Sequence, residues 1–478
     1  MKPLDQPIGN GFSSLLLCLT VALAPLPFGS TDAWTTSVWC ITLGLALTQV
    51  QPAQLRSAHW RLLGLVGLLA LAYAFVISEQ LVGNSWLSIS VPNPLWRESS
   101  ALLKTPLPAA LTVAHNQPWL ALGPTLSMAL ALICAFLVGL DRDRARMLMR
   151  AVAWSGTAYA GLGIVQHIFD PTQVLWRDKQ AYIDSLTGPF INRNTAAVYF
   201  GVCAILWLLF LFEKIETLLP SRNDAASLWR LLLTRSNEIQ LPALMFMLCL
   251  AAMLLTGSRA GVVISLVAMV AASPLFFSRR LSRTSAVGIA LAAGVGVALV
   301  LFETIGAGVN ARFELDQLAT GGRWEAYRST LEIIADYPWL GTGLGTFAWI
   351  FPAYRSGTIS IRGVWDRAHD TALELTSEMG IPLALMVAAG WVVIVAVLCS
   401  GIRKRRRDRI FPIAGCLAAS VALLHSLIDF SLQIPGFALV IAALTGTGLA
   451  QSFQTGKRAS ERVGQGARHK AKGTDCRP

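Results

Sequence analysis

The sequence predicts an all-α, polytopic integral membrane protein with about twelve transmembrane helices. Its 478 residues have a mean hydropathy of +0.56, and 54% of them are hydrophobic while 14% are charged. Apolar stretches of about 18–22 residues, the length that crosses the bilayer core, recur along the chain. Each stretch is expected to be helical, because a helix satisfies its own backbone hydrogen bonds in lipid.

The apolar stretches give the positions of the expected spans. They cover residues 12–29, 33–50, 61–78, 118–139, 150–168, 195–212, 241–256, 261–277, 285–303, 381–400, 411–428 and 434–452. The first span is not a cleavable signal peptide, because only Lys2 precedes it as a cation and further spans follow Pro25 and Pro27.

The positions of Lys and Arg predict the orientation of these spans. With the N-terminus inside, most of the 39 Lys and Arg residues fall in inner connections and in the tail, although the outer side holds the longest loops. The main inner groups are Arg142 to Arg150, Arg279 to Arg283 and Arg403 to Arg407. This positive-inside pattern predicts that both termini are cytoplasmic and that the connections 79–117 and 303–380 face outward.

The net charge of +12 does not predict a nucleic-acid partner. Topology determinants and contact with anionic membrane lipids account for the excess of cations. The eight cysteines show no CxxC or Cys/His ligand spacing, so no metal site is predicted. The basic tail 453–478 is expected to be disordered.

Polar residues of the back half gather in the connection 303–380, between the ninth and tenth spans. Its distinctive pieces are Gly321-Gly322-Arg323-Trp324, Asp336-Tyr337-Pro338-Trp339, Gly341-Thr342-Gly343-Leu344-Gly345 and Arg367-Ala368-His369-Asp370. A protein that places its polar residues in one loop between apolar spans is expected to carry out its chemistry there.

Two parts of this connection predict local structure. The stretch Tyr327–Tyr337 is amphipathic, with an apolar stripe of Leu331, Ile333 and Ile334. It predicts a helix lying along the membrane surface, whose stripe is most simply explained by packing. The glycine run 341–345 follows no strand and lacks the spacing of a dinucleotide fingerprint. It predicts a flexible loop or a close backbone approach to a ligand.

Two shorter outer connections also carry polar residues. In Asn192-Arg193-Asn194, before the sixth span, Asn194 can cap the helix, while Arg193 also suits a phosphate or a sugar. Thr256-Gly257-Ser258-Arg259-Ala260-Gly261 joins two spans almost without a linker. Arg259 can snorkel to headgroups, or it can face an internal cavity where the following helix N-terminus and the guanidinium converge on an anion.

Two histidines lie at outer helix ends. His369 precedes a helical pattern, so it can cap that helix or act as a general base, because imidazole titrates near neutral pH. In the second interpretation Asp370 or Glu374 orients the ring. His425 and Asp429 are four residues apart on one helix face and are expected to form a helix-stabilising pair, since no third metal ligand is evident.

In their order and spacing, these pieces resemble the O-antigen ligase/polymerase superfamily of bacterial envelope glycosyltransferases. The resemblance covers roughly residues 150–450. It rests on Phe190–Asn194, Thr256–Gly261, Gly322–Trp324, Tyr337–Gly343, His369-Asp370 with Leu373-Glu374, and His425–Phe430.

The resemblance implies a GT-C-like, multi-pass enzyme of the bacterial inner membrane with a periplasmic active site. The chain would then comprise N-terminal helices (1–149), an O-antigen ligase/polymerase-like core (150–452) and the tail. The enzyme would transfer a glycan from undecaprenyl pyrophosphate to an acceptor hydroxyl, without a metal or other cofactor. The acceptor would be the lipid A core for a ligase, or a growing surface polysaccharide or exopolysaccharide for a polymerase. The residues leave both open. The segment 79–117 either shapes acceptor choice or sits at the membrane interface.

The resemblance also implies roles for particular residues. Arg259 and Arg323 would hold the pyrophosphate, and His369 would activate the acceptor. Guanidinium groups suit such a leaving group because they bind bidentately and stay charged. The further residues expected to bind substrate are Asn192, Arg193, Asn194, Ser258, Trp324, Arg367, Asp370, Glu374 and His425.

The alternative function is a transporter or flippase of lipid-linked glycans. Such a protein is expected to show repeated halves with helices broken near the middle of the membrane. The sequence shows no corresponding pair of interrupted spans, and its polar residues gather on one side. A transferase is therefore the favoured function.

Overall fold

The computed structural model describes residues 8–51, 55–82, 86, 91–218, 236–278, 309–359 and 365–453. In these ranges the regular structure is helical, apart from an antiparallel hairpin of β1 (Gln173–Val174) and β2 (Arg177–Asp178). The expected span 285–303 and nearly all of the tail lie outside the described residues.

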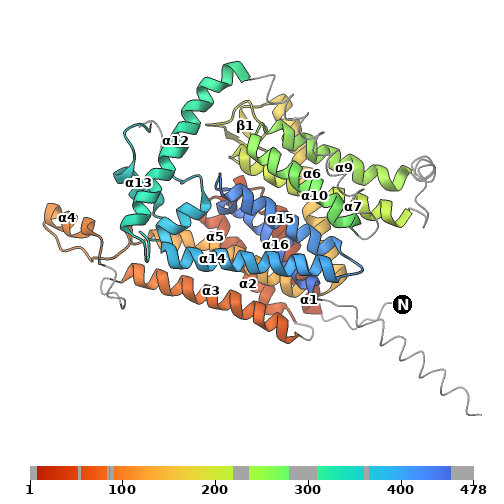
Figure 1. The fold of residues 1–478 in the computed structure, drawn as a ribbon, viewed down its shortest axis with the longest axis horizontal. Coiled ribbons are helices and arrows are strands. Elements are labelled where there is room, and N and C mark those ends of the chain that lie inside the picture. Colours follow the sequence, from red (N-terminus) through yellow and green to blue (C-terminus); the bar gives the residue numbers. More distant parts are fainter. Residues whose placement is uncertain are drawn as a thin grey trace, which may run out of the picture.

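Long helices, roughly aligned with one another, form the body of the molecule (Figure 1). They are α1 (Ile8–Leu23), α2 (Ala33–Gln49), α3 (Ser57–Leu81), α5 (Gln117–Val138), α6 (Arg142–Phe169), α7 (Arg193–Leu218), α9 (Ser236–Leu255), α10 (Arg259–Phe277), α14 (Thr371–Lys404), α15 (Ile410–Ser426) and α16 (Pro435–Ser452). Every expected span within the described ranges coincides with one of these helices. Among the described residues, seven helices are long and apolar enough to cross a membrane, which confirms a polytopic membrane protein.

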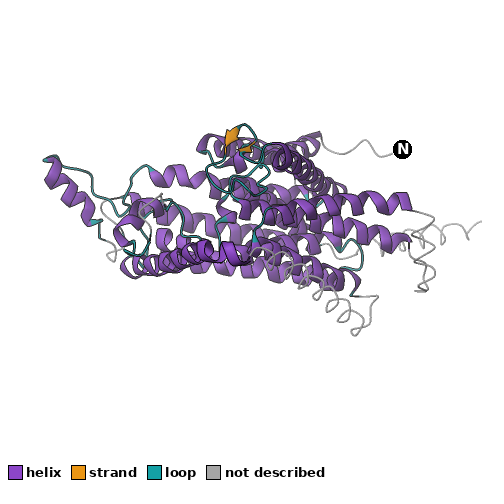
Figure 2. Cartoon of the chain, turned by 90° about the horizontal axis from the view of Figure 1, so that it is seen from above, coloured by secondary structure: helices purple, strands orange, loops and turns teal. Residues whose placement is uncertain are grey.

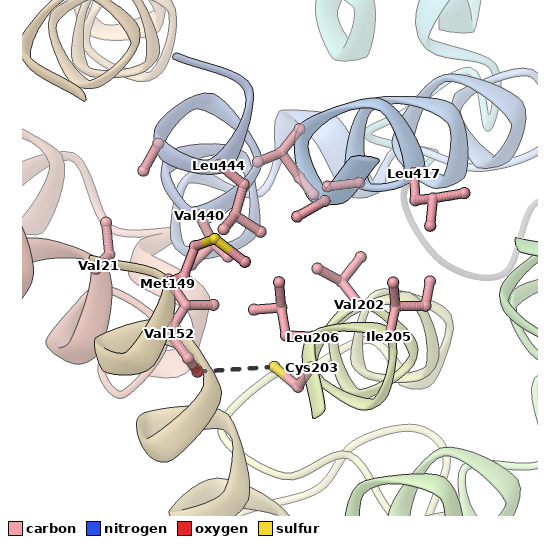
Figure 3. Packing of buried hydrophobic residues seen from close by; sticks show 14 of the residues in the cluster. Val21, Met149, Val152, Val202, Cys203, Ile205, Leu206, Leu417, Val440 and Leu444 are labelled. Carbon is pink, nitrogen blue, oxygen red and sulfur yellow. Dashed lines mark hydrogen bonds between the residues drawn. The ribbon is translucent and has the colours of Figure 1, made fainter. Parts of the chain in front are cut away.

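The helix α16 is the centre of the bundle, and it is buried along its whole length. It packs against α5 and α15. Val440 and Leu444 on α16 face apolar side chains from four other helices, including Val21, Met149 and Leu417 (Figure 3). An apolar helix that is buried on all sides fits the core of a large helical bundle.

One end of the bundle gathers arginines from connections that the sequence places inside. Arg146 pairs with Glu213 at 2.5 Å and Arg142 with Asp408 at 2.8 Å. Arg409 donates to the backbone oxygen of Leu275 at 2.9 Å. These contacts join the connections next to α6, α7, α10 and α15, so those connections share one end of the bundle, as the charge pattern requires.

Three further helices lie at the opposite end (Figures 1 and 2). They are α4 (Pro94–Leu103), α12 (Val309–Asp336) and α13 (Phe347–Tyr354). A small core of its own, which includes Ala326, Ile333, Phe347, Phe351 and Ala368, holds this region together. This end, which the sequence predicts to face outward and which is called the outer end below, therefore forms a packed layer rather than an open loop.

The expected surface helix Tyr327–Tyr337 is the last part of α12, which ends at Asp336. Of the predicted apolar stripe, Ile333 and Ile334 are buried, whereas Leu331 is 52% exposed. The buried side packs against α13 and α14. Contact with the protein therefore accounts for that side.

The outer segment 79–117 braces this layer. The Val113 amide donates to the Thr342 backbone oxygen at 3.1 Å, and the Thr112 amide donates to that of Gln80 at 3.0 Å. The Asn93 side chain donates to the Tyr337 hydroxyl at 2.9 Å. The segment thus supports the chain that leads from α12 to α13.

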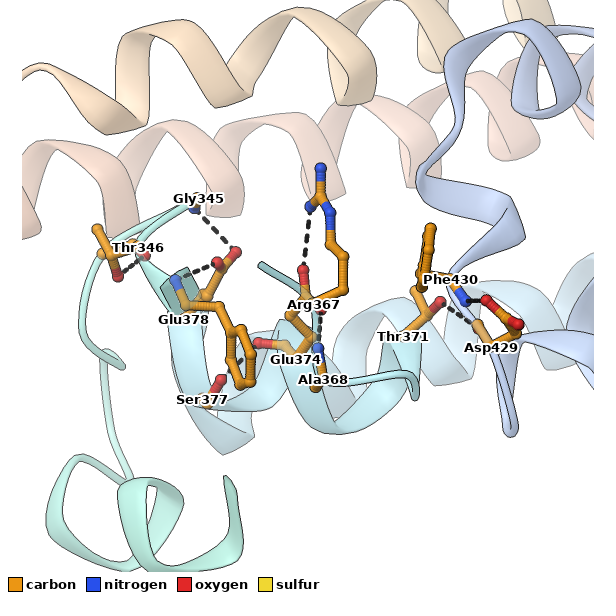
Figure 4. A network of polar contacts seen from close by, with 12 residues as sticks. Gly345, Thr346, Arg367, Ala368, Thr371, Glu374, Ser377, Glu378, Asp429 and Phe430 are labelled. Atoms are coloured by element: carbon orange, nitrogen blue, oxygen red, sulfur yellow. Dashed lines mark hydrogen bonds and ion pairs between the residues drawn. The ribbon is translucent and has the colours of Figure 1, made fainter. Parts of the chain in front are cut away.

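The glycine run 341–345 packs against α14, so the close approach predicted for it is to protein rather than to a ligand. Four of its five residues are buried. The Glu378 carboxylate accepts hydrogen bonds from the backbone amides of Gly345 at 2.8 Å and Phe347 at 2.9 Å (Figure 4). The expectation of a flexible loop was wrong, because this buried carboxylate fixes the backbone.

Gly380 divides α14 into two helical segments. Its φ of 81° and ψ of 161° are not helical, and the expected span 381–400 begins directly after it. A Cβ on Gly380 would lie 2.1 Å from the Trp339 backbone oxygen. The kink therefore requires glycine for both its conformation and its space.

We expect Gly380→Ala to destabilise the folded protein by more than about 2 kcal/mol, because it adds left-handed strain and a backbone clash. Gly390→Ala on the same helix is the matched control, since its Cβ would meet only Leu69 at 3.9 Å. Thermal unfolding of both detergent-solubilised variants measures the difference. Equal melting temperatures would contradict this account of the kink.

Candidate active site

Asp429 is the buried centre of the polar cluster at the outer end. It lies in the turn after α15, before the short helix η2 (Ser431–Gln433), and is 2% exposed. The Asn194 side chain donates a short hydrogen bond to one carboxylate oxygen. The Asn192 side chain, at 3.5 Å, and the Phe430 amide, at 2.7 Å, donate to the other. Two residues expected to bind substrate thus hold a carboxylate of the protein.

Asn192, rather than Asn194, caps the start of α7. Its side-chain oxygen accepts a hydrogen bond from the Asn194 backbone amide at 2.7 Å, which is the usual N-cap contact. The expectation that Asn194 caps the helix was wrong. The cap leaves the Asn194 side chain free to reach Asp429.

His369 lies beside this cluster, between two aromatic rings. The ring centroids of Trp365 and Phe430 lie 5.5 and 5.1 Å from its own. Its Nδ1 is buried and has no hydrogen-bond partner in the described part of the chain. Its φ of 56° is left-handed, a strained conformation that is common at functional sites.

The backbone around His369 is held on both sides. The Tyr327 hydroxyl donates to the His369 backbone oxygen at 3.0 Å. The Ala368 amide donates to the Glu374 carboxylate at 2.7 Å, and Arg367 donates to the same carboxylate at 3.1 Å (Figure 4). Arg367 and Glu374 therefore fix the loop that carries His369.

Neither carboxylate proposed to orient His369 makes that contact. Asp370 accepts a hydrogen bond from the Leu373 amide at 2.9 Å and so caps α14, while Glu374 binds Arg367 and Ala368. The charge of Asp429, from another segment, raises the pKa of His369. The sequence interpretation did not foresee this effect of Asp429.

The charges of Arg323 and Asp429 both affect the pKa values of His369, Tyr327 and Tyr182. Burial lowers the pKa of His369, while Asp429 raises it and Arg323 lowers it further. Burial raises the pKa values of Tyr327 and Tyr182, and there too the charges of Arg323 and Asp429 oppose each other. The charge of Arg323 therefore acts on His369 and on both tyrosines.

His425 lies next to the cluster. Its Nδ1 contacts Ser431 instead of forming the expected side-chain pair with Asp429. That nitrogen is 3.0 Å from the Ser431 hydroxyl, which is 3.1 Å from the Thr195 hydroxyl. The two residues are nevertheless one helical turn apart, as expected, because the Asp429 amide donates to the His425 backbone oxygen at 2.9 Å. Because His425 is 1% exposed, its contacts lie inside the protein.

The arginine motifs lie on the neighbouring connections. Arg193 donates to the Ser185 hydroxyl at 3.3 Å and stacks over Tyr182 at 5.1 Å. A Cβ on Gly257 would lie 3.9 Å from the Arg193 guanidinium, so the tight connection between α9 and α10 abuts Arg193. This arrangement brings two of the predicted motifs together.

Arg259 begins α10, as the sequence predicted, and its side chain is exposed. Ser258 is the N-cap, and its hydroxyl accepts a hydrogen bond from the Gly261 amide at 3.3 Å. Trp324 is also exposed and lies edge-on to Tyr327, with centroids 6.5 Å apart. The exposed Arg259 and Trp324 side chains can reach a ligand without rearrangement of the core.

Comparison with protein-family models matches residues 244–388 to the family described as O-antigen ligase. Residues 244–388 thus carry a segment of the O-antigen ligase family. The matched segment carries Arg259, Arg323 and His369, whereas Asn192 and Asp429 lie outside it. No curated protein matched the chain.

The outer cluster combines guanidinium groups, a partly buried imidazole and a buried carboxylate. Guanidinium groups bind phosphate oxygens bidentately, and a neutral imidazole can accept a proton. Among the described residues, no three His, Cys, Asp or Glu side chains gather as a metal site. The groups present therefore suit anion binding together with proton transfer.

Proposed function

We propose that this protein transfers a glycan from undecaprenyl pyrophosphate to an acceptor hydroxyl at the periplasmic face of the bacterial inner membrane. The observation that carries the proposal is His369, a partly buried imidazole between the rings of Trp365 and Phe430. Its buried Nδ1 has no hydrogen-bond partner among the described residues, and burial lowers its pKa. The match of residues 244–388 to the O-antigen ligase family supports the same class of reaction.

The proposed reaction needs one proton acceptor and cations for the leaving group. The acceptor oxygen attacks the anomeric carbon, its proton passes to His369, and the bond from that carbon to the pyrophosphate breaks. The pyrophosphate leaves on its polyprenol with the bonding electron pair. Arg259 and Arg323 offset its growing negative charge, and no metal is required for this role.

Asp429 has a supporting role in this proposal. When His369 takes the proton it becomes a cation, and the nearby carboxylate stabilises that cation. Asn192 and Asn194 hold the carboxylate in place. Trp324 and the neighbouring exposed groups would contact the sugar or the acceptor.

Envelope glycans from a strain that lacks the gene test the proposed function. A polymerase predicts loss of long chains on gels, and a ligase predicts long chains that are not attached to the lipid A core. A transporter predicts lipid-linked units that accumulate inside the cell. Complementation with the wild-type gene is the control, and an unchanged glycan profile would overturn the proposal.

A further inference from the structure

An apolar crevice lies between α3, α5, α14 and α16, in the half of the bundle next to the end where the arginines of the inner connections meet, called the arginine end below. Val66 of α3, Phe136 of α5, Ile394 of α14 and Leu449 of α16 line it, and its other lining residues are apolar too. Its volume is about 20 Å³. The crevice is therefore too shallow to enclose a molecule, but the side of a hydrocarbon chain can lie along it.

The helix α3 is attached more firmly at its outer end than at the crevice. It lies at the edge of the bundle, beside α14 (Figure 1), and only 22% of its apolar window is buried in the protein. At the outer end the Gln80 side chain donates to the backbone oxygens of Leu340 at 2.5 Å and Glu378 at 2.8 Å. At the crevice a hydrocarbon chain would supply packing contacts that the protein leaves unmade.

Cations of α3 lie at the arginine end of the crevice. The Arg56 guanidinium donates to the Phe453 backbone oxygen at 3.2 Å, and the Phe453 ring lies 6.3 Å from that of Phe136, which lines the crevice. Arg56 shares a helix face with Val66. Both Arg56 and Arg61 are exposed, so they can contact a ligand whose chain lies in the crevice.

The charges on the α14 side of this end also favour an anion. Arg405 is 7% exposed and donates to the Gln451 side chain at 3.0 Å, whereas the neighbouring Lys404 is exposed. Asp408 is the carboxylate nearby, and it pairs with Arg405 at 3.8 Å and with Arg142 at 2.8 Å. The carboxylate is thus engaged by arginines, and the exposed groups beside the crevice are cationic.

We propose that the crevice and the cations at its end bind a phospholipid with an anionic headgroup, whose acyl chain lies against Val66 and Phe136. Basic sites between membrane helices suit such headgroups, whereas a zwitterionic headgroup carries a cation of its own and gains less from Arg56 and Arg61. The bound lipid fastens α3 to the bundle. It thereby supports Gln80, which braces the outer layer from the other end of α3. The site is far from His369, at the opposite end of α14, and does not depend on the proposed function.

Native mass spectrometry of the full-length protein tests the headgroup preference. The probes are phosphatidylglycerol and phosphatidylcholine with the same acyl chains. We expect the wild type to bind phosphatidylglycerol more tightly, and this lipid alone to raise the melting temperature. Arg61→Ala should weaken phosphatidylglycerol binding by about fivefold, and Arg56→Ala with Arg61→Ala by about thirtyfold, the factors for losing one and two cations at a lipid surface. Arg150→Ala is the control, because Arg150 is exposed on α6, which does not line the crevice.

Val66→Phe fills the crevice and tests the place of the acyl chain. It should weaken phosphatidylglycerol binding by about tenfold, the factor for losing burial of two methylene groups. Leu65→Phe is the matched control, since Leu65 is exposed on the same helix and does not line the crevice. Equal binding of the two lipids by the wild type, or wild-type binding in the double arginine variant, would overturn the inference. Equal effects of Val66→Phe and Leu65→Phe would overturn it as well. If Val66→Phe does not fold, the exposed arginine variants still decide the outcome.

Discussion

Replacing Arg323 by alanine is expected to lower glycan transfer by about 10²–10³-fold, the usual effect of removing one group that stabilises transition-state charge. Arg323 is half-buried on α12, and its charge reaches His369, Tyr327 and Tyr182. In the proposed reaction the pyrophosphate leaves next to Arg323 and develops negative charge. Transfer of glycan by the purified variant, at equal protein abundance, measures the effect.

Arg328→Ala is the control for this substitution. Arg328 lies on the same helix, but its side chain is 66% exposed and pairs only weakly with Glu325 at 3.7 Å. Arg323→Lys and Arg259→Lys should restore part of the activity lost in the alanine variants, because an ammonium supplies charge without the bidentate fork. Wild-type activity in Arg323→Ala would refute the pyrophosphate role.

The fold could be predicted from the sequence wherever the signal is local. The lengths of the apolar stretches predicted the helices. The positions of the arginines predicted which connections lie at the same end of the bundle. The sequence did not predict the kink at Gly380; it predicted only that a span begins directly after this residue. Its cause is the backbone of Trp339, which approaches from a separate segment, and no local pattern encodes that approach.

The sequence indicated several residues of the candidate site, but it did not indicate which of them contact one another. His369 and Arg323 were singled out from their motifs, and their roles in catalysis stay predictions. Asp429 was noticed only for its spacing from His425, because its partners Asn192 and Asn194 lie more than 200 residues earlier. Tyr182 and Tyr327 were missed, since neither stands out in a sequence without its neighbours.

Two buried carboxylates explain why Arg367 and the glycine run, whose patterns suit ligand binding, instead contact the protein. Glu374 and Glu378, four residues apart on α14, hold the loop of His369 and the glycine run respectively. A helix presents such residues on one face, and the loops supply backbone amides as partners. Arg367 and the glycines thus shape the site, although their sequence patterns also suit ligand binding.

His369→Ala is the second substitution with a large expected effect. Loss of a general base typically lowers the rate by about 10²–10⁴-fold, so transfer should fall in that range while the protein remains folded. His115→Ala serves as the control, because His115 also lies in the outer layer, where it contacts Trp96 and the Pro108 backbone oxygen. Full transfer by His369→Ala would remove His369 from the mechanism.

The pH dependence of transfer distinguishes a base at His369 from a structural histidine. A base must be neutral, and burial lowers the pKa of His369 from 6.5, so the acid limb of kcat/KM should lie below pH 6.5. Asp429 raises this pKa, because its charge favours the imidazolium. Asp429→Asn should therefore move the acid limb to still lower pH and reduce the maximal rate, since the imidazolium formed during transfer loses its counter-charge. An acid limb that stays in place, or moves to higher pH, would show that Asp429 does not act electrostatically on the catalytic base.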